Sequence, residues 1–150
     1  LRGWAVILEL EPAAVAADKL ELNALDAKRR PYLKHFLQLG GLGIRDLCRQ
    51  GDDLLILAGL TMDLDGPVRV LRWPGSAKRH QSGEMVAADA LQFVLDIPYG
   101  AGVDHAEGMT LFSPDGGTTQ SLLVVYDAVA EARKPDENAV LADVFALPDR

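Results

Sequence analysis

Residues 43–59 read GIRDLCRQGDDLLILAG and carry the clearest strand signal of the chain. It holds a mixed segment at 43–47 and an apolar segment at 54–58, separated by a polar stretch that contains glycine and two aspartates. Apolar runs of this length between glycine and aspartate are typical of β-strands joined by turns. We therefore predict two consecutive strands here. The second strand is apolar at every position, which is typical of a strand covered on both faces.

The same pattern recurs along the whole chain, and helix signals are scarce. Several runs rich in β-branched and apolar residues alternate with glycine, proline and aspartate, so the sequence predicts an all-β architecture. The expected strands are 4–10, 32–39, 43–49, 54–58, 68–73, 91–97, 105–112, 122–127 and 140–147.

These strands are arranged as a repeat. A complete unit of four strands occupies 43–98, and its first three strands are answered by segments beginning at 105, 122 and 140. The two units are offset by about 62 residues, a spacing in the range of repeat architectures. A four-strand unit that repeats predicts the blades of a β-propeller. The alternative is a small sandwich or a pair of antiparallel meanders.

The repeat divides the chain into the end of one blade at 1–39, a complete blade at 40–98 and a following blade at 99–150. Propellers have about 4 to 8 blades, so roughly two to two and a half blades form a partial propeller. We expect the rest of a longer propeller chain to cover the open sheet edges.

Residues 12–26 are the exception to the strand pattern. Their alanines, together with Pro12 at the first turn, favour a short surface helix. The alternation at 19–22 is equally consistent with an irregular excursion between strands.

Composition excludes several functions. The 150 residues carry 22 acidic and 15 basic side chains, a net charge of −7, and the pI is near 4.8, which argues against a nucleic-acid partner. The basic clusters at 28–30 and 78–80 are short and read as solvated loops. No apolar run approaches the roughly 20 residues that span a bilayer, so we expect no membrane partner. The single Cys48 fits a reducing, cytoplasmic location.

The candidate functional residues lie on the first strand of each unit, because ligands of propellers bind around the central channel that these strands line. They are Arg45 and Asp46 in one unit and His105 and Glu107 in the next. Arg45 and Glu107 occupy equivalent positions. Their opposite charges could bind a polar ligand or pair with each other.

The densest group of candidate residues is Asp104-His105-Ala106-Glu107-Gly108. On a regular strand, His105 and Glu107 point to the same face and could work as an acid and base pair. Asp127 ends the next strand, and with Glu107 it would offer carboxylates to a hard cation such as calcium or magnesium. The simpler alternative is that Asp104 and Asp127 bind turn backbone while His105 packs against a neighbour.

Several segments together resemble a bacterial family known only as a domain of unknown function. These segments are 32–37, 41–47, 53–59 and 105–109. The resemblance implies a longer, propeller-like protein of which this chain is the C-terminal part. Glu107-Gly108 followed by residues 123–127 is also distantly similar to lactonase-like and phytase-like propeller hydrolases. That likeness implies a metal-ligand role for Glu107.

Two functions are then compatible with the sequence. The first is a propeller module that binds a protein or a small ligand through its channel face, with Arg45, Asp46 and Asp104 among the contacts. The second is a metal-dependent hydrolase of phosphoester or lactone substrates, with Glu107 holding the cation.

Overall fold

The structure is a computed structural model that describes residues 3–13, 19–61, 65–78, 80, 82–114, 116 and 120–148. Within these ranges the chain forms ten strands in three sheets and only two short 3-10 helices, η1 (Ala88–Ala90) and η2 (Glu131–Arg133). The all-β prediction is therefore confirmed. No helix of the described residues is long and apolar enough to cross a membrane.

The central sheet corresponds to the complete four-strand unit of the sequence. It runs in the order β3 (Gly43–Gln50), β4 (Asp53–Gly59), β5 (Val68–Trp73) and β7 (Gln92–Ile97), each antiparallel to the next. A short turn joins β3 to β4, and a long connection at 74–91, which includes β6 (Met85–Val86) and η1, joins β5 to β7. The predicted strand order of this unit is confirmed.

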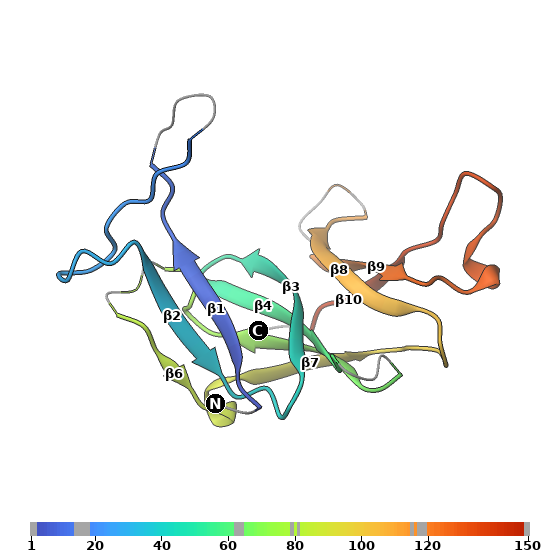
Figure 1. The fold of residues 1–150 in the computed structure, drawn as a ribbon. Coiled ribbons are helices and arrows are strands. Elements are labelled where there is room, and N and C mark those ends of the chain that lie inside the picture. Colours follow the sequence, from blue (N-terminus) through green and yellow to red (C-terminus); the bar gives the residue numbers. More distant parts are fainter. Residues whose placement is uncertain are drawn as a thin grey trace.

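The C-terminal sheet is a second meander. It consists of β8 (His105–Phe112), β9 (Ser121–Asp127) and β10 (Asp143–Ala146). β8 of this sheet lies beside β3 of the central sheet, so the first strands of the two units are neighbours (Figure 1).

The N-terminal sheet differs from a simple meander. β1 (Ala5–Leu10) pairs antiparallel with β2 (Tyr32–Leu37), and β2 also pairs in parallel with the two-residue β6 (Met85–Val86). β6 comes from the connection between β5 and β7 of the central sheet. This connection therefore joins the two sheets, which the sequence did not predict.

The helix predicted over 12–26 is wrong for the residues that the structure describes there, 12–13 and 19–26. Pro12 forms an antiparallel bridge with Leu22. The Ala13 amide donates to the Glu21 carbonyl, and the Asn23 amide to the Glu11 carbonyl, each at 2.8 Å. This pairing joins 11–13 to 21–23 in a register separate from that of β1 with β2. The backbone polar groups of these residues are therefore satisfied between two extended segments instead of along a helix.

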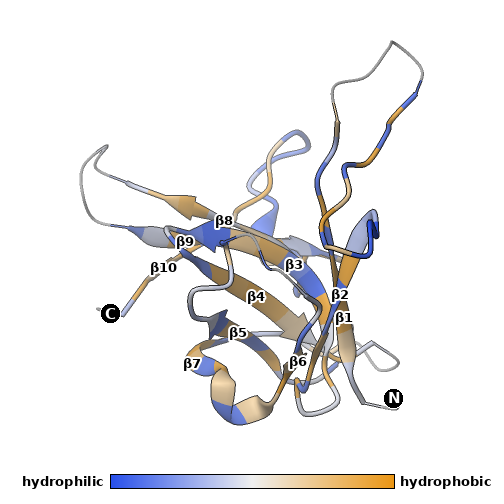
Figure 2. Cartoon of the chain, turned by 90° about the vertical axis from the view of Figure 1, so that its left-hand side faces the viewer, coloured by the Kyte–Doolittle hydropathy of each residue, from blue (hydrophilic) through white to orange (hydrophobic). Residues whose placement is uncertain are grey.

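The core lies on both faces of β4. Ile56 belongs to an apolar cluster with Leu37 and Trp73, between the N-terminal and central sheets. Leu57 belongs to a second cluster with Leu122 and Val124, between the central and C-terminal sheets. Both β4 residues are fully buried, which explains why this strand is apolar throughout (Figure 2).

Candidate functional site

The structure pairs two of the residues predicted to line a channel. Arg45 of β3 forms an ion pair with Glu107 of β8. A second guanidinium nitrogen of Arg45 donates to the Leu60 carbonyl at 2.5 Å. The guanidinium is almost fully buried, while the carboxylate is about two-fifths exposed. Of the two roles considered for these charges, pairing with each other is the one observed.

Asp46 joins the same two strands through backbone groups. One carboxylate oxygen accepts a hydrogen bond from the Met109 amide at 2.7 Å, and the other accepts from the Leu47 amide at 2.8 Å. Met109 lies on β8, so Asp46 fastens β3 to the next sheet. Both oxygens thus hold the protein's own backbone.

His105 and Glu107 have different partners. His105 is buried and its Nε2 lies 3.1 Å from Asp65 Oδ1, whereas Glu107 contacts Arg45. The register of β8 against β9 shifts between Ala106 and Gly108, which marks a β-bulge at Glu107. A bulge interrupts the two-residue alternation of a strand. The assumption of a regular strand, which placed both side chains on one face, therefore does not apply here.

The two predicted aspartates both bind turn backbone. Asp104 accepts from the Ala130 amide at 2.9 Å, and Asp127 accepts from the Ala128 amide at 2.8 Å. Asp104 also faces Arg133 Nε at 3.0 Å. These contacts are those of the simpler alternative, in which both aspartates bind turn backbone.

Arg133 also binds Asp143, and this ion pair makes the stability of the fold depend on pH. Two guanidinium nitrogens donate to the two Asp143 oxygens at 3.0 and 2.7 Å, and the Tyr126 hydroxyl donates at 2.7 Å. The hydrogen bonds from Arg133 lower the pKa of Asp143, although burial opposes them. A carboxylate with a lowered folded-state pKa stabilises the fold above its unfolded pKa, and this stability is lost as the pH falls through the folded value.

We therefore expect acid to destabilise the wild-type chain more steeply than an Asp143→Asn variant once the pH falls below about 4. The free energy of unfolding, measured by urea denaturation at a series of pH values, checks this. Asp96→Asn, at an exposed surface pair with Arg69, is the matched control for loss of one carboxylate. Parallel pH profiles for wild type and Asp143→Asn would contradict the prediction.

A different group of side chains converges where the N-terminal and central sheets meet. Glu9, His35 and His80 each offer a ligand atom, and these atoms all lie within 4.8 Å of one another. Within the described part of the chain, this is the one set of three or more His, Cys, Asp or Glu residues that meets this condition. None of the three was a candidate from the sequence.

Strand pairing positions two of the three. His35 of β2 lies directly opposite Ile7 of β1, and Glu9 is two residues further along the same face. Diagonal neighbours of this kind are within reach of long side chains. His35 Nε2 and Glu9 Oε2 are 3.0 Å apart. Pairing of the two strands therefore brings the carboxylate beside a fully buried imidazole.

His80 comes from the connection that joins the two sheets. On one side, the Ala77 amide donates to the Asp52 carbonyl at 2.9 Å; on the other, the Phe36 amide donates to the Glu84 carbonyl at 2.9 Å. Gly83 lies so close to the β2 backbone that a Cβ there would clash with the Lys34 carbonyl. These contacts hold the connection across the end of the site, and His80 is mostly buried. Of the solvated loop predicted at 78–80, Lys78 is exposed as expected, His80 is not, and residue 79 lies outside the described residues.

Glu9 binds His80 twice. His80 Nδ1 lies 2.8 Å from Glu9 Oε2, and the His80 amide donates to Glu9 Oε1 at 3.2 Å. Burial acts to raise the pKa of Glu9, but the hydrogen bonds from His80 and His35 outweigh it, and the net pKa lies below the usual value. Because an ionised carboxylate only accepts hydrogen bonds, the imidazole nitrogens that face it carry the protons.

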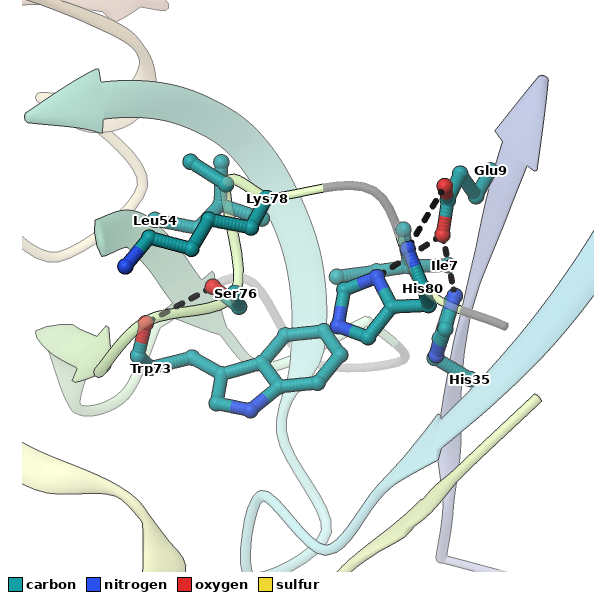
Figure 3. Close-up of a pocket in the computed structure, with 9 residues that line it drawn as sticks. Ile7, Glu9, His35, Leu54, Trp73, Ser76, Lys78 and His80 are labelled. Atoms are coloured by element: carbon teal, nitrogen blue, oxygen red, sulfur yellow. Dashed lines mark hydrogen bonds and ion pairs between the residues drawn. The ribbon is translucent and has the colours of Figure 1, made fainter. Parts of the chain in front are cut away.

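Trp73, the last residue of β5, forms one wall of the site. Its ring stacks on His80 with centroids 5.4 Å apart and meets His35 edge-on at 5.3 Å. Figure 3 shows the indole beneath His80, with Glu9 above the two imidazoles and joined to both by dashed lines. The Ser76 hydroxyl donates to the Trp73 carbonyl at 2.7 Å and fixes the turn after β5.

A cavity of about 200 Å³ opens beside these side chains. Ile7 and Leu54 supply apolar lining, and Glu9, His35 and His80 supply polar lining. Lys78 also borders the cavity, but its ammonium is 3.0 Å from Asp52 and points away from Glu9 (Figure 3). The arrangement is an anionic, partly aromatic pocket with imidazole nitrogens at its wall.

The sequence held a signal for two of these residues. Glu9 has the same strand parity as Ala5 and Ile7, and His35 the same parity as Leu33 and Leu37, which are buried. A carboxylate and an imidazole on the apolar face of adjacent strands are costly unless they are paired or used. His80 had no such signal, because its position depends on the connection between sheets.

An all-β chain of three sheets, with a polar cluster between two of them, defines a class of architecture without defining an activity. Residues 1–143 match the family described as protein of unknown function (DUF3616). The chain belongs to this family, which confirms the expected membership of a domain-of-unknown-function family. No curated protein and no solved structure gave a significant match.

Proposed function

We propose that this chain is part of a β-propeller that binds a small cation in the pocket between its N-terminal and central sheets. The propeller architecture is supported by two consecutive antiparallel meanders whose first strands, β3 and β8, lie side by side. In a propeller the first strands of neighbouring blades face the central channel. The three sheets would then be a partial propeller of about two to two and a half blades.

The observation that carries the binding function is the convergence of Glu9, His35 and His80 on one cavity. The ionised Glu9 gives the pocket a negative charge, while the ammonium of Lys78 is directed elsewhere. The Trp73 ring adds a face that attracts cations through its quadrupole. Charge and aromatic lining therefore both favour a positively charged ligand.

The pocket is a better candidate than the predicted channel face. At the channel face, Arg45 and Glu107 neutralise each other and Asp46 holds backbone amides. At the pocket, the Glu9 carboxylate is partly buried and lies against two imidazoles. Imidazole rings are hydrogen-bond donors and also common metal ligands, so these contacts can be exchanged for contacts to a bound cation. Binding through the channel face is the alternative, and Glu9→Gln and Glu107→Gln distinguish the two sites.

We expect at least one cation to stabilise the wild-type chain and not Glu9→Gln. A ligand at about a hundredfold excess over its dissociation constant adds about 2.7 kcal/mol to the free energy of unfolding. Thermal unfolding followed by circular dichroism, with Zn²⁺, Mn²⁺, Ca²⁺ and tetramethylammonium tested in turn, measures this effect. Glu9→Gln removes the charge and keeps the shape of the side chain.

Glu107→Gln is the matched control, because it removes the carboxylate of the other candidate site. Stabilisation that survives Glu107→Gln and disappears in Glu9→Gln supports the pocket. The reverse pattern supports the channel face. If no cation stabilises the wild-type chain, cation binding is wrong.

A metal-dependent hydrolase of phosphoesters or lactones is the second candidate function. Three protein ligands are typical of catalytic metal sites, which keep a further position for water or substrate. The observation that favours this candidate is the cavity bordering the three side chains. Hydrolysis of p-nitrophenyl phosphate and of a small lactone, each compared with Glu9→Gln, tests it.

A further inference from the structure

Two of the three converging side chains, Glu9 and His35, point inward from strands. On β1 the outward face is apolar instead: Val6 and Leu8 are about half exposed. Turning a carboxylate and an imidazole inward costs stability unless they are compensated. Places where a sequence departs from its local pattern are expected to be functional sites.

His35 also carries a buried polar atom that no other described atom satisfies. Its Nε2 faces Glu9, but its Nδ1 is buried without a hydrogen-bond partner among the described residues. Most buried polar atoms in native proteins are bonded, so the unpartnered Nδ1 sets His35 apart from an ordinary core residue, while its Nε2 is the atom that faces Glu9. The orphaned nitrogen belongs to the residue that lies deepest in the group.

The distances are close to those of a coordination sphere. Ligand atoms around a tetrahedral zinc ion, with bonds of about 2.0–2.2 Å, are about 3.4 Å apart. Glu9 Oε2 is 3.0 Å from His35 Nε2 and 2.8 Å from His80 Nδ1. A separation larger by about half an ångström would exchange these two hydrogen bonds for bonds to one ion. Each imidazole would then carry its proton on the other ring nitrogen, His35 Nδ1 and His80 Nε2, because a metal-binding nitrogen must be unprotonated.

We propose, building on the cation-binding function above, that Glu9, His35 and His80 coordinate a divalent transition-metal ion of the zinc class. Two imidazoles and one carboxylate suit zinc and its neighbours, whereas calcium and magnesium take oxygen ligands. The calcium or magnesium considered at Glu107 and Asp127 is therefore a different chemistry at a different place.

The surroundings restrain the two imidazoles. Glu84 Oε1 lies 4.0 Å from His80 Nε2, the nitrogen turned away from Glu9. A separation of 4.0 Å is too long for a hydrogen bond, so Glu84 lies near the outer nitrogen without fixing the orientation of the ring. Trp73 packs against both imidazoles and limits their rotation. The ligands are thus held by three elements: β1, β2 and the β5–β6 connection.

The test uses the full chain, purified without affinity metal and treated with chelator, and titrated with Zn²⁺. The chain has three histidines, so their imidazole NMR signals report the site directly in the unaltered protein. We expect one equivalent of Zn²⁺ to shift the signals of His35 and His80 and to leave His105 unchanged. Shifts at all three, or at His105 alone, would overturn the proposal.

Substitutions give a second measurement. Loss of a residue that only orients a metal ligand lowers metal affinity about 10–100-fold, and loss of the ligand itself should lower it more. We therefore expect His80→Ala to reduce the Zn²⁺ affinity measured by calorimetry at least about 100-fold. Glu107→Gln should bind like wild type. Equal affinity in His80→Ala and wild type would mean an adventitious surface ion and would overturn the proposal.

The outcomes also separate this inference from the function on which it rests. If tetramethylammonium stabilises the chain through Glu9 and Zn²⁺ does not bind, the pocket takes organic cations, so the metal site is wrong and the cation-binding function stands. If neither binds, both are wrong. Visible absorption of the Co²⁺-loaded chain adds a check, since an intense tetrahedral spectrum that is absent in His80→Ala supports coordination by these residues.

Discussion

Ile56→Ala and Leu57→Ala are each expected to lower the free energy of unfolding by about 2–5 kcal/mol, the range for large aliphatic side chains removed from a core. The two residues are neighbours on β4, and both are fully buried. Ile56 packs in the cluster with Leu37 and Trp73, while Leu57 packs in the cluster with Leu122 and Val124. Successive side chains point to opposite faces of a strand, so the two variants test the packing on the two faces of the central sheet separately.

Urea denaturation followed by circular dichroism measures both variants, and Val125→Ala is the control. Val125 is also a strand residue but is about half exposed, so its truncation should change stability by no more than about 0.5 kcal/mol. If one of the two β4 variants is as mild as this control, the corresponding face of the sheet is not packed against its neighbour. A loss at both positions establishes that three sheets share two cores through one strand.

The apolar stretch at 54–58 is also the reason that the fold could be predicted. A strand without polar positions has no face suited to solvent, so it must be covered on both sides. Together with the turn residues around it, this predicts an all-β chain with more than one sheet. The strand order of the central sheet followed, because strands that are consecutive in sequence usually pair with each other, and β5 and β7 do so despite the long connection between them. β6 could not be predicted, since its two residues have no strand pattern and depend on β2.

The helix expected near residues 12–26 is absent from the described residues there, 12–13 and 19–26, while residues 14–18 lie outside the described part of the chain. Helix propensity is a weak preference that tertiary context overrides. Here Pro12 pairs with Leu22, in a register separate from that of β1 with β2, which places Leu10 opposite Tyr32.

The candidate site was harder to predict than the fold. Asp104, His105 and Glu107 drew attention because they are close in sequence, yet each of them has a separate partner. Glu9 and His80 are 71 positions apart in the sequence. They come together only because the β5–β6 connection returns to the N-terminal sheet. Sequence spacing finds sites built on one element, whereas this site depends on three.

Trp73→Ala is the substitution expected to affect both the core and the pocket. Trp73 is buried, and the loss of a buried tryptophan side chain costs about 3–5 kcal/mol. The same truncation removes the ring that stacks on His80 and meets His35. Aromatic pairs of this kind contribute about 0.5–1.5 kcal/mol beyond area burial, so we expect the affinity for Zn²⁺ to fall by up to about tenfold in the folded protein.

Trp73→Phe is the matched variant, because it keeps an aromatic ring on the same backbone. We expect it to retain most of the stability and affinity that Trp73→Ala loses. Unfolding is followed by circular dichroism, since Trp4 would be the one remaining tryptophan fluorophore, and Zn²⁺ binding by the imidazole signals of His35 and His80. If Trp73→Ala folds and binds Zn²⁺ with wild-type affinity, Trp73 belongs to the core alone. If affinity falls in Trp73→Ala and returns in Trp73→Phe, the ring positions the imidazoles, and the pocket and the core are one packed unit.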